Sequence, residues 1–258
     1  MTGIHCQRCR RPICGECMQP ASVGFQCPRC VSRGRAGVRT PKRSFGGALS
    51  RGGGTAAKVV MVALTAVYLL DFIAGGLLQS VLVMSNYDVT GGQFWRLVTA
   101  AFTSGSLLGL LMNLLVLWLA GRAIESEVGS WRFVALFLVA GLGGTTVFFV
   151  FGPFAGAALG ASAAVVGLLA ANALGKRHTG EDIRADVGLL VLLVLYAVLV
   201  GFASFGWLTL VGGIAVGALA GWILAYAPRR HRATIQVLGL LAVVVACAAA
   251  VAAKLSLF

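Results

Sequence analysis

A single serine within a long apolar stretch is the first residue whose surroundings suggest chemistry. Ser162 lies in the run Gly160–Gly167, GASAAVVG, at the start of a predicted apolar helix. A polar side chain inside an apolar segment costs free energy unless another group satisfies it, so the hydroxyl is a candidate functional group. The alternative is packing, because Gly, Ala and Ser also mark close contacts between membrane helices. The rest of the chain has to decide between the two.

Six of the seven cysteines form three pairs near the start of the chain. They are Cys6 and Cys9, Cys14 and Cys17, and Cys27 and Cys30. A gap of two residues lets both thiolates of a pair reach one tetrahedral ion, and two pairs complete a zinc site. In a cross-braced arrangement the first and third pairs share one ion. The second pair then needs further ligands, of which His5 could supply one.

Two interpretations of these cysteines are open at this point. A disulfide framework requires an oxidising compartment, whereas zinc ligation requires reduced thiols. A segment of this size has too little apolar mass to fold without such a constraint. Under the zinc interpretation, either the second site is incomplete or the natural module begins further upstream.

The composition is that of a polytopic membrane protein. Of the 258 residues, 59% are hydrophobic and 11% are charged, whereas a soluble domain has about 25% charged residues. The net charge of +13 would suggest nucleic acid if the basic residues lay on a soluble face. The basic N-terminal segment carries no aromatic stacking platform, so no nucleic-acid partner is expected. The polar, Cys-rich N-terminus does not resemble a secretory signal peptide.

Seven apolar segments have the length of about 20 residues that a bilayer requires. They are predicted at 58–79, 105–123, 131–152, 158–175, 186–203, 207–227 and 234–253. The predicted organisation is a zinc-binding module (1–31), a flexible basic linker (32–57), a six-helix membrane domain (58–230) and an additional C-terminal transmembrane helix (231–258). The fold class is therefore an all-α polytopic membrane protein with a small N-terminal module.

The positions of Lys and Arg predict the orientation. Of the 21 Lys and Arg residues, 19 fall in the compartment that contains the N-terminus and only two on the opposite side. The positive-inside rule therefore predicts a cytoplasmic N-terminus and an external C-terminus. The Cys pairs would then lie in reducing cytosol, which favours zinc and a cytosolic protein partner for the module. The linker cations could bind anionic lipid, or the linker could be a plain tether.

Two further features concern how the segments pack. The external connection 80–104 is long and partly apolar, and its Trp95-Arg96 suits the headgroup layer, so we expect it to lie partly in the membrane. The sixth segment carries a stripe of glycines at four-residue spacing, and the fourth offers a matching surface of small residues. These are Gly213, Gly217 and Gly221 on the sixth segment, and Gly160, Ala164 and Gly167 on the fourth.

Taken in order, these features resemble the rhomboid family of intramembrane serine proteases over about residues 90–230. The motifs are Trp95-Arg96, Asn113 in the second segment, Gly121–Glu125, Gly160-Ala161-Ser162, and Trp207 through Gly212-Gly213. The resemblance implies a rhomboid-like six-helix bundle, followed here by one more helix. The Cys-pair module and basic linker look like those of actinobacterial members, which implies a bacterial plasma membrane.

The resemblance also implies a Ser/His dyad and its supporting groups. Ser162 matches the nucleophile and Asn113 the oxyanion Asn, while Trp95 and Arg96 match the substrate-binding loop. The family's helix-six pattern is Trp-x-x-His-x-Gly-Gly, and the position of the base is Leu210 in this chain. No other cofactor than structural zinc is implied.

Further positions of the family pattern also differ. The His one turn before the oxyanion Asn is Gly109, and the His of the preceding Phe-x-His pattern is Ser104. The Gly after the nucleophile is Ala163, and the aromatic ring four residues after it is Val166. Losing one triad member costs about 10⁴–10⁶ in rate, and losing an oxyanion donor costs about 10²–10³ more.

Three functions follow as hypotheses. The first is a catalytically impaired or inactive rhomboid homologue that binds transmembrane segments of client membrane proteins. The second is an active rhomboid serine endopeptidase that uses Ser162 with an unconventional base. The third is a small-solute transporter, for which Asp71 and Glu125 are the main intramembrane charges.

Overall fold

The structure is a computed structural model that describes residues 4–37, 54–179, 182–201, 205–228 and 231–256. The chain divides into two compact units, Met1–Lys42 and Arg43–Phe258. Most of the predicted basic linker, residues 38–53, lies outside the described residues. The start of that predicted linker is helical, because α1 (Pro28–Gly37) continues through it.

The N-terminal unit is small and has little apolar interior. It contains a 3-10 turn η1 (Gly15–Cys17), a hairpin of β1 (Gln19–Pro20) and β2 (Phe25–Gln26), and α1. The hairpin pairs Gln19 with Gln26 in antiparallel register. Cys6 and Ile13 are its buried hydrophobic residues among those described. So small a core agrees with a unit that depends on metal for its fold.

The second unit is an assembly of long helices that makes this an integral membrane protein. Its main helices are α2 (Thr55–Ile73), α6 (Leu107–Val116), α7 (Arg122–Val128), α8 (Ser130–Phe151), α9 (Ala161–Thr179), α10 (Arg184–Gly201), α11 (Trp207–Tyr226) and α12 (Arg232–Leu255). A π-helical turn, η3 (Leu117–Gly121), joins α6 to α7. Every predicted apolar segment overlaps one of these helices. Five spans in the described residues are long and apolar enough to cross a membrane: α2, the continuous helix Leu107–Val128, α8, α11 and α12.

The first helix ends earlier than predicted. The predicted segment extends to residue 79, but α2 stops at Ile73. Gly75 and Gly76 follow with φ of 63° and 90°, a left-handed conformation that glycine adopts without steric cost. The chain turns there and resumes as the short helix α3 (Leu77–Leu82).

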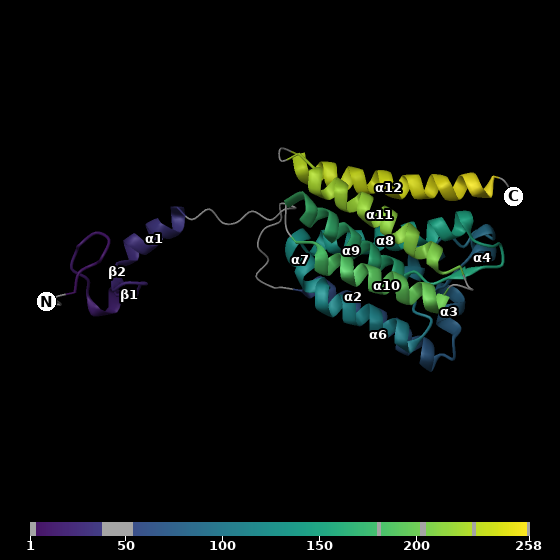
Figure 1. The fold of residues 1–258 in the computed structure, drawn as a ribbon, viewed down its shortest axis with the longest axis horizontal. Helices are drawn as coiled ribbons and strands as arrows, with labels where there is room; N and C mark the ends of the chain where they lie inside the picture. Colours follow the sequence, from purple (N-terminus) through teal and green to yellow (C-terminus); the bar gives the residue numbers. More distant parts are fainter. Residues whose placement is uncertain (1–3, 38–53, 180–181, 202–204, 229–230, 257–258) are drawn as a thin grey trace. The chain divides into compact units, whose positions relative to one another are not determined.

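The long connection before α6 is folded into short elements. After α3 come β3 (Met84–Ser85), α4 (Asn86–Thr90), α5 (Arg96–Thr99) and the 3-10 turn η2 (Ala100–Phe102). In Figure 1, α3 and α4 lie at the end of the helix assembly where α12 finishes, whereas α7 lies at the other end. The strand β3 pairs antiparallel with β4 (Ala157–Ala158), the segment just before α9.

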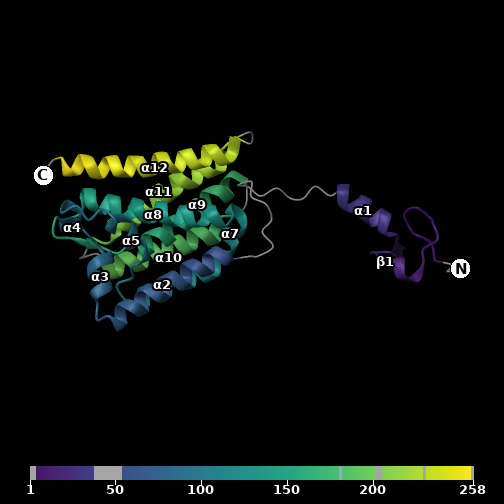
Figure 2. The ribbon, with the colours of Figure 1, turned by 180° about the vertical axis from the view of Figure 1, so that it is seen from behind.

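Helix α9 lies in the interior and packs on α8, α10 and α11, as Figures 1 and 2 show from opposite sides. The predicted glycine stripe of α11 does meet α9. A Cβ at Gly213, Gly217 or Gly221 would collide with backbone of Ala163, Gly167 and Ala171, respectively. The partner face of α9 is therefore rotated from the predicted one, and only Gly167 belongs to both sets. Helix α12 packs on α8 and α11.

A buried carboxylate joins the start of α2 to α7. Glu125 accepts backbone N–H bonds from Ala56 at 3.1 Å and Ala57 at 2.9 Å, and a bond from the Ser130 hydroxyl at 2.7 Å. The first N–H groups of a helix have no partner within the helix, and they favour an anion. Glu125 thus caps the N-terminus of α2, and its carboxylate oxygens accept hydrogen bonds from groups of the protein.

Candidate functional site

Ser162 and Asn113, 49 residues apart in sequence, meet in the structure. Ser162 is in the first turn of α9 and Asn113 is on α6. The Asn113 Nδ2 donates a hydrogen bond to the Ser162 Oγ at 3.2 Å. Asn113 is 2% exposed, and Ser162 is partly exposed. The two side chains that the sequence analysis assigned to the nucleophile and oxyanion positions are therefore neighbours.

The start of α9 is fixed by contacts to the connection before α6. The Gly160 N–H donates to the Ala100 carbonyl at 2.9 Å. A Cβ at Gly160 would lie 2.8 Å from the Ala100 carbonyl carbon, so only glycine allows this approach. Together with the β3–β4 pairing, this contact holds the Ser162 backbone against the loop.

The position of the family's base is filled by an apolar side chain. Leu210 is 3% exposed and belongs to the main hydrophobic core. It lies one turn before Gly213, which packs against Ala163, so Leu210 is on the part of α11 beside the start of α9. Val166, one turn after Ser162, is buried in the same core.

No imidazole is brought near Ser162 among the described residues. His178 is in the last turn of α9, about 24 Å along the helix from Ser162 at the usual rise per residue. His231 precedes α12, beyond the opposite end of α11 from Leu210. His5 belongs to the N-terminal unit. At the predicted oxyanion His position, the Gly109 N–H donates to the Ser106 Oγ at 3.1 Å.

Trp95 and Arg96 differ in exposure. Arg96 is buried, and it donates to the Gln93 side chain at 2.7 Å and to the Val83 carbonyl at 2.8 Å. Its guanidinium also lies 3.4 Å from the Asp88 carboxylate. Trp95 is half exposed. Arg96 therefore holds the loop together, while half of the Trp95 side chain stays exposed.

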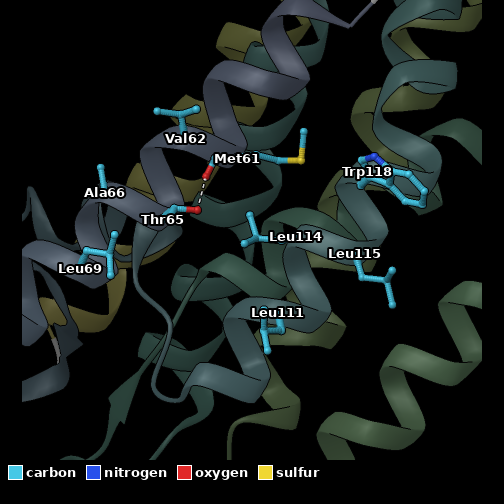
Figure 3. Close-up of a pocket in the computed structure, with 9 residues that line it drawn as sticks. All are labelled: Met61, Val62, Thr65, Ala66, Leu69, Leu111, Leu114, Leu115 and Trp118. Atoms are coloured by element: carbon cyan, nitrogen blue, oxygen red, sulfur yellow. Dashed lines mark hydrogen bonds between the residues drawn. The ribbon is translucent and has the colours of Figure 1, made fainter.

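An apolar groove lies beside the site, between α2 and α6 (Figure 3). Its volume is about 660 Å³. Leu111, Leu114 and Leu115 of α6 line it. These residues flank Asn113 in the sequence, and the Asn113 side chain is buried. Trp118 closes one end and is 69% exposed. The polar atom of Thr65 is satisfied by the Met61 carbonyl at 2.9 Å, so the groove presents an apolar surface.

Four of the six paired cysteines form a cluster in the N-terminal unit. The sulfur atoms of Cys6, Cys9, Cys27 and Cys30 lie within 4.8 Å of one another, and those of Cys9 and Cys27 are 3.7 Å apart. Zinc–sulfur bonds of about 2.3 Å in a tetrahedron require sulfur separations in this range. These four residues therefore fit a metal ion. Cys14 and Cys17, which flank or belong to η1, are outside the cluster.

The backbone around this cluster favours thiolates. The Cys27 N–H donates to the Cys6 Sγ at 3.3 Å, and this bond lowers the pKa of the Cys6 thiol to about 6. Cys30 shows the opposite effect, because the neighbouring Cys27 sulfur raises its pKa to about 12. A bound cation would favour the thiolate form of both cysteines, since the thiolate is the form that binds a metal.

Neither of the two carboxylates that the transporter hypothesis names is free to carry an ion among the described contacts. Asp71 is buried and accepts from the Gln79 backbone N–H and side-chain amide, both at 2.8 Å. Glu125 caps α2, as described above. Both therefore have a structural role, which leaves the transporter hypothesis without a supporting observation.

Comparison with known proteins bears on the family of this chain. The Rhomboid domain family matches residues 91–227. Rhomboid protease GluP of Bacillus subtilis is 40% identical over 86 residues, which cover 33% of this chain and 17% of that protein. The Rhomboid protease GlpG homolog of Cronobacter sakazakii is 31% identical over 140 residues, 54% of this chain and 50% of that protein.

A longer alignment is found with Rhomboid protease GlpG of Salmonella choleraesuis, at 28% identity over 193 residues, covering 74% of this chain and 69% of that protein. The chain spans half or less of the length of the first two relatives. Because the matched domain covers more than half of the 258 residues, this chain belongs to the rhomboid family.

Proposed function

We propose that this chain is a rhomboid homologue with little or no peptidase activity that binds transmembrane segments of client membrane proteins. The observation that carries the proposal is the contrast between two positions. Ser162 keeps its hydrogen bond to Asn113, whereas the position of the base is the buried Leu210. The hydrogen bond between the nucleophile and oxyanion positions supports descent from an acyl-transfer site, and no histidine supplies a proton acceptor beside it in the described part of the chain.

The chemical reason is the protonation of the serine. A Ser hydroxyl is a weak nucleophile at neutral pH unless an adjacent base removes its proton. The Asn113 amide nitrogen is a hydrogen-bond donor and does not accept that proton. No histidine lies beside Ser162 in the described part of the chain, so the hydroxyl stays protonated.

Client binding is proposed for the groove between α2 and α6. The groove is apolar, open towards the surrounding bilayer and large enough to receive side chains of another helix. Its α6 wall is the outer side of the helix that carries Asn113 inward. Association of helices in lipid relies on such close packing, since lipid tails are as apolar as leucine.

The remaining parts of the proposal concern topology and metal. The proposed location is a bacterial plasma membrane with a cytoplasmic N-terminus and an external C-terminus, supported by the distribution of Lys and Arg. Zinc is the proposed ion of the Cys6, Cys9, Cys27 and Cys30 cluster, because four Cys sulfur atoms within 4.8 Å of one another suit an ion that prefers four thiolate ligands. A cytosolic protein is the proposed partner of this unit.

An active endopeptidase with an unconventional base is the second candidate, favoured by the intact Ser162–Asn113 bond. A serine-directed fluorophosphonate probe separates the two candidates. We expect no labelling of the purified protein above that of Ser162→Ala. Labelling of the wild-type chain that Ser162→Ala abolishes would establish the second candidate instead.

Client binding is tested by site-specific photo-crosslinking in membranes. A photoreactive residue at Leu115, in the groove, should capture membrane proteins, and one at the exposed Leu241 of α12 serves as the matched lipid-facing control. Equal yields from the two positions, or none from Leu115, would contradict the proposed groove.

A further inference from the structure

A buried polar network joins α8, α11 and α12 at the end where α8 and α12 begin. The Arg132 Nε donates to the Gln236 Oε1 at 2.8 Å, and the Gln236 Nε2 donates to the Leu224 carbonyl at 2.9 Å. Gln236 is fully buried and Arg132 is 7% exposed.

This network contains a buried cation without an acidic partner in the described residues. The ion pairs there join Arg96 to Asp88 and Lys176 to Asp186, and none includes Arg132. Its guanidinium donates to the Val128 carbonyl at 3.0 Å and lies 4.9 Å from the Trp131 ring centroid. These groups carry only partial negative charge, and a buried full charge is costly unless an opposite charge accompanies it.

A second arginine, Arg232, lies at the same end of the helix assembly. Arg232 is one helical turn before Gln236 on α12, so the two share a face, and Gln236 touches Arg132. Two guanidinium groups from two helices are thus brought to one end of the assembly. Two such basic side chains at the end of neighbouring transmembrane helices suit the phosphate of an anionic lipid headgroup.

An apolar groove begins one turn further along the membrane. It has a volume of about 470 Å³ and lies between α8, α11 and α12. Ile223 and Gly239 are at its start, next to Leu224 and Gln236 of the network, and Ala246 and Ala250 are further along. The helix rises about 16 Å from Gly239 to Ala250, roughly half of a hydrocarbon core of about 30 Å.

We propose that this surface binds one anionic phospholipid, whose phosphate lies at Arg132 and Arg232 and whose acyl chain fills the groove. The charge of the network selects an anionic headgroup, and the length of the groove matches one leaflet. Under the proposed topology this leaflet is the cytoplasmic one. The proposal is independent of whether Ser162 is active.

The test is native mass spectrometry of the full chain in detergent with one added lipid at a time. Palmitoyl-oleoyl phosphatidylglycerol and palmitoyl-oleoyl phosphatidylcholine have the same chains and differ in net charge. We expect the protein to bind phosphatidylglycerol with about fivefold higher affinity. Equal affinity for the two lipids would overturn the proposal.

Variants assign the binding to the two parts of the site. Arg232→Gln should bring the two affinities close to parity, and Arg232→Lys should keep the preference because the charge is kept. Ala246→Phe should fill the groove and lower the affinity for phosphatidylglycerol about tenfold. Ala248→Phe, on the exposed face of α12 that does not line the groove, is the control.

Two results would contradict this assignment. One is a phosphatidylglycerol preference that survives in Arg232→Gln. The other is an affinity that Ala246→Phe and Ala248→Phe lower equally. Because Ala246→Phe leaves the buried Arg132–Gln236 bond intact, the test does not depend on replacing Arg132.

Discussion

At the scale of single residues, the site depends on which group can accept a proton from Ser162. Asn113 provides a donor at 3.2 Å and so suits an oxyanion, which carries negative charge after the attack. A base must lie within hydrogen-bond reach of the hydroxyl, and at the family's base position α11 carries the buried, apolar Leu210. The hydrogen bond of the resting site and the identity of the residue at the base position are separate properties, and our proposal of low activity rests on the second.

Restoring imidazoles at two positions should create serine reactivity. We expect Gly109→His combined with Leu210→His to increase fluorophosphonate labelling about 10²-fold, the lower end of what a positioned general base contributes. A Cβ at Gly109 would lie 3.2 Å from the Ser106 Oγ, so a side chain there requires a small shift of that hydroxyl. Ser162→Ala in the same background is the control. Unchanged labelling of a double variant that still unfolds cooperatively on heating would contradict this prediction.

Contacts between residues that are far apart in the chain are the hardest feature of this protein to predict from its sequence. The Asn113–Ser162 neighbourhood was anticipated from the family motifs. The capping of α2 by Glu125, 69 residues from Ala56, was not, because a lone Glu at a helix end has no local pattern that names its partner. Gln236, fully buried yet surrounded by apolar sequence, gave no signal of its contact with Arg132.

At the scale of elements, the sequence predicted where helices occur better than how they face one another. The apolar segments and the α11 glycine stripe are visible in the sequence because they follow helical spacing. The face of α9 that receives this stripe is not visible, since small residues surround much of that helix. Ala164 instead lies 3.4 Å from the position of a Cβ at Gly141 of α8. Rotation about a helix axis is decided by all neighbours at once.

Packing of α9 against α11 should be sensitive to one added methyl group. A Cβ at Gly217 would overlap the Gly167 carbonyl oxygen and lie 2.6 Å from its Cα, and backbone cannot move aside as a side chain can. We expect Gly217→Ala to lower the free energy of unfolding by about 1–3 kcal/mol. Gly188→Ala on α10, where a Cβ meets no atom within 4 Å, is the matched control. Thermal unfolding in one detergent measures both, and equal effects would contradict the prediction.

At the scale of the whole molecule, the two units have different sources of stability. The second unit, Arg43–Phe258, has an extensive buried core. The N-terminal unit has two buried hydrophobic residues among those described and one cluster of four thiols. Sequence spacing predicted the sharing of one ion by the first and third Cys pairs, since a cross-braced fold alternates its pairs. Arg10 has a left-handed backbone conformation, and its N–H donates to the Cys6 carbonyl at 2.8 Å. The spacing of the cysteines does not predict this conformation.

Removing metal should therefore unfold the N-terminal unit alone. We expect the full chain to purify with about one zinc ion, to lose it in Cys9→Ser, and to keep it in Cys14→Ser, whose sulfur lies outside the cluster. Treatment with a chelator should make residues before 38 sensitive to protease while the thermal unfolding of the membrane unit stays unchanged, because metal binding and folding are coupled only where the ligands are. Elemental analysis and limited proteolysis of the same samples measure both effects. Equal zinc loss in the two Cys variants would show that the ion is held differently, and a lower unfolding temperature of the membrane unit would show that the two units are coupled.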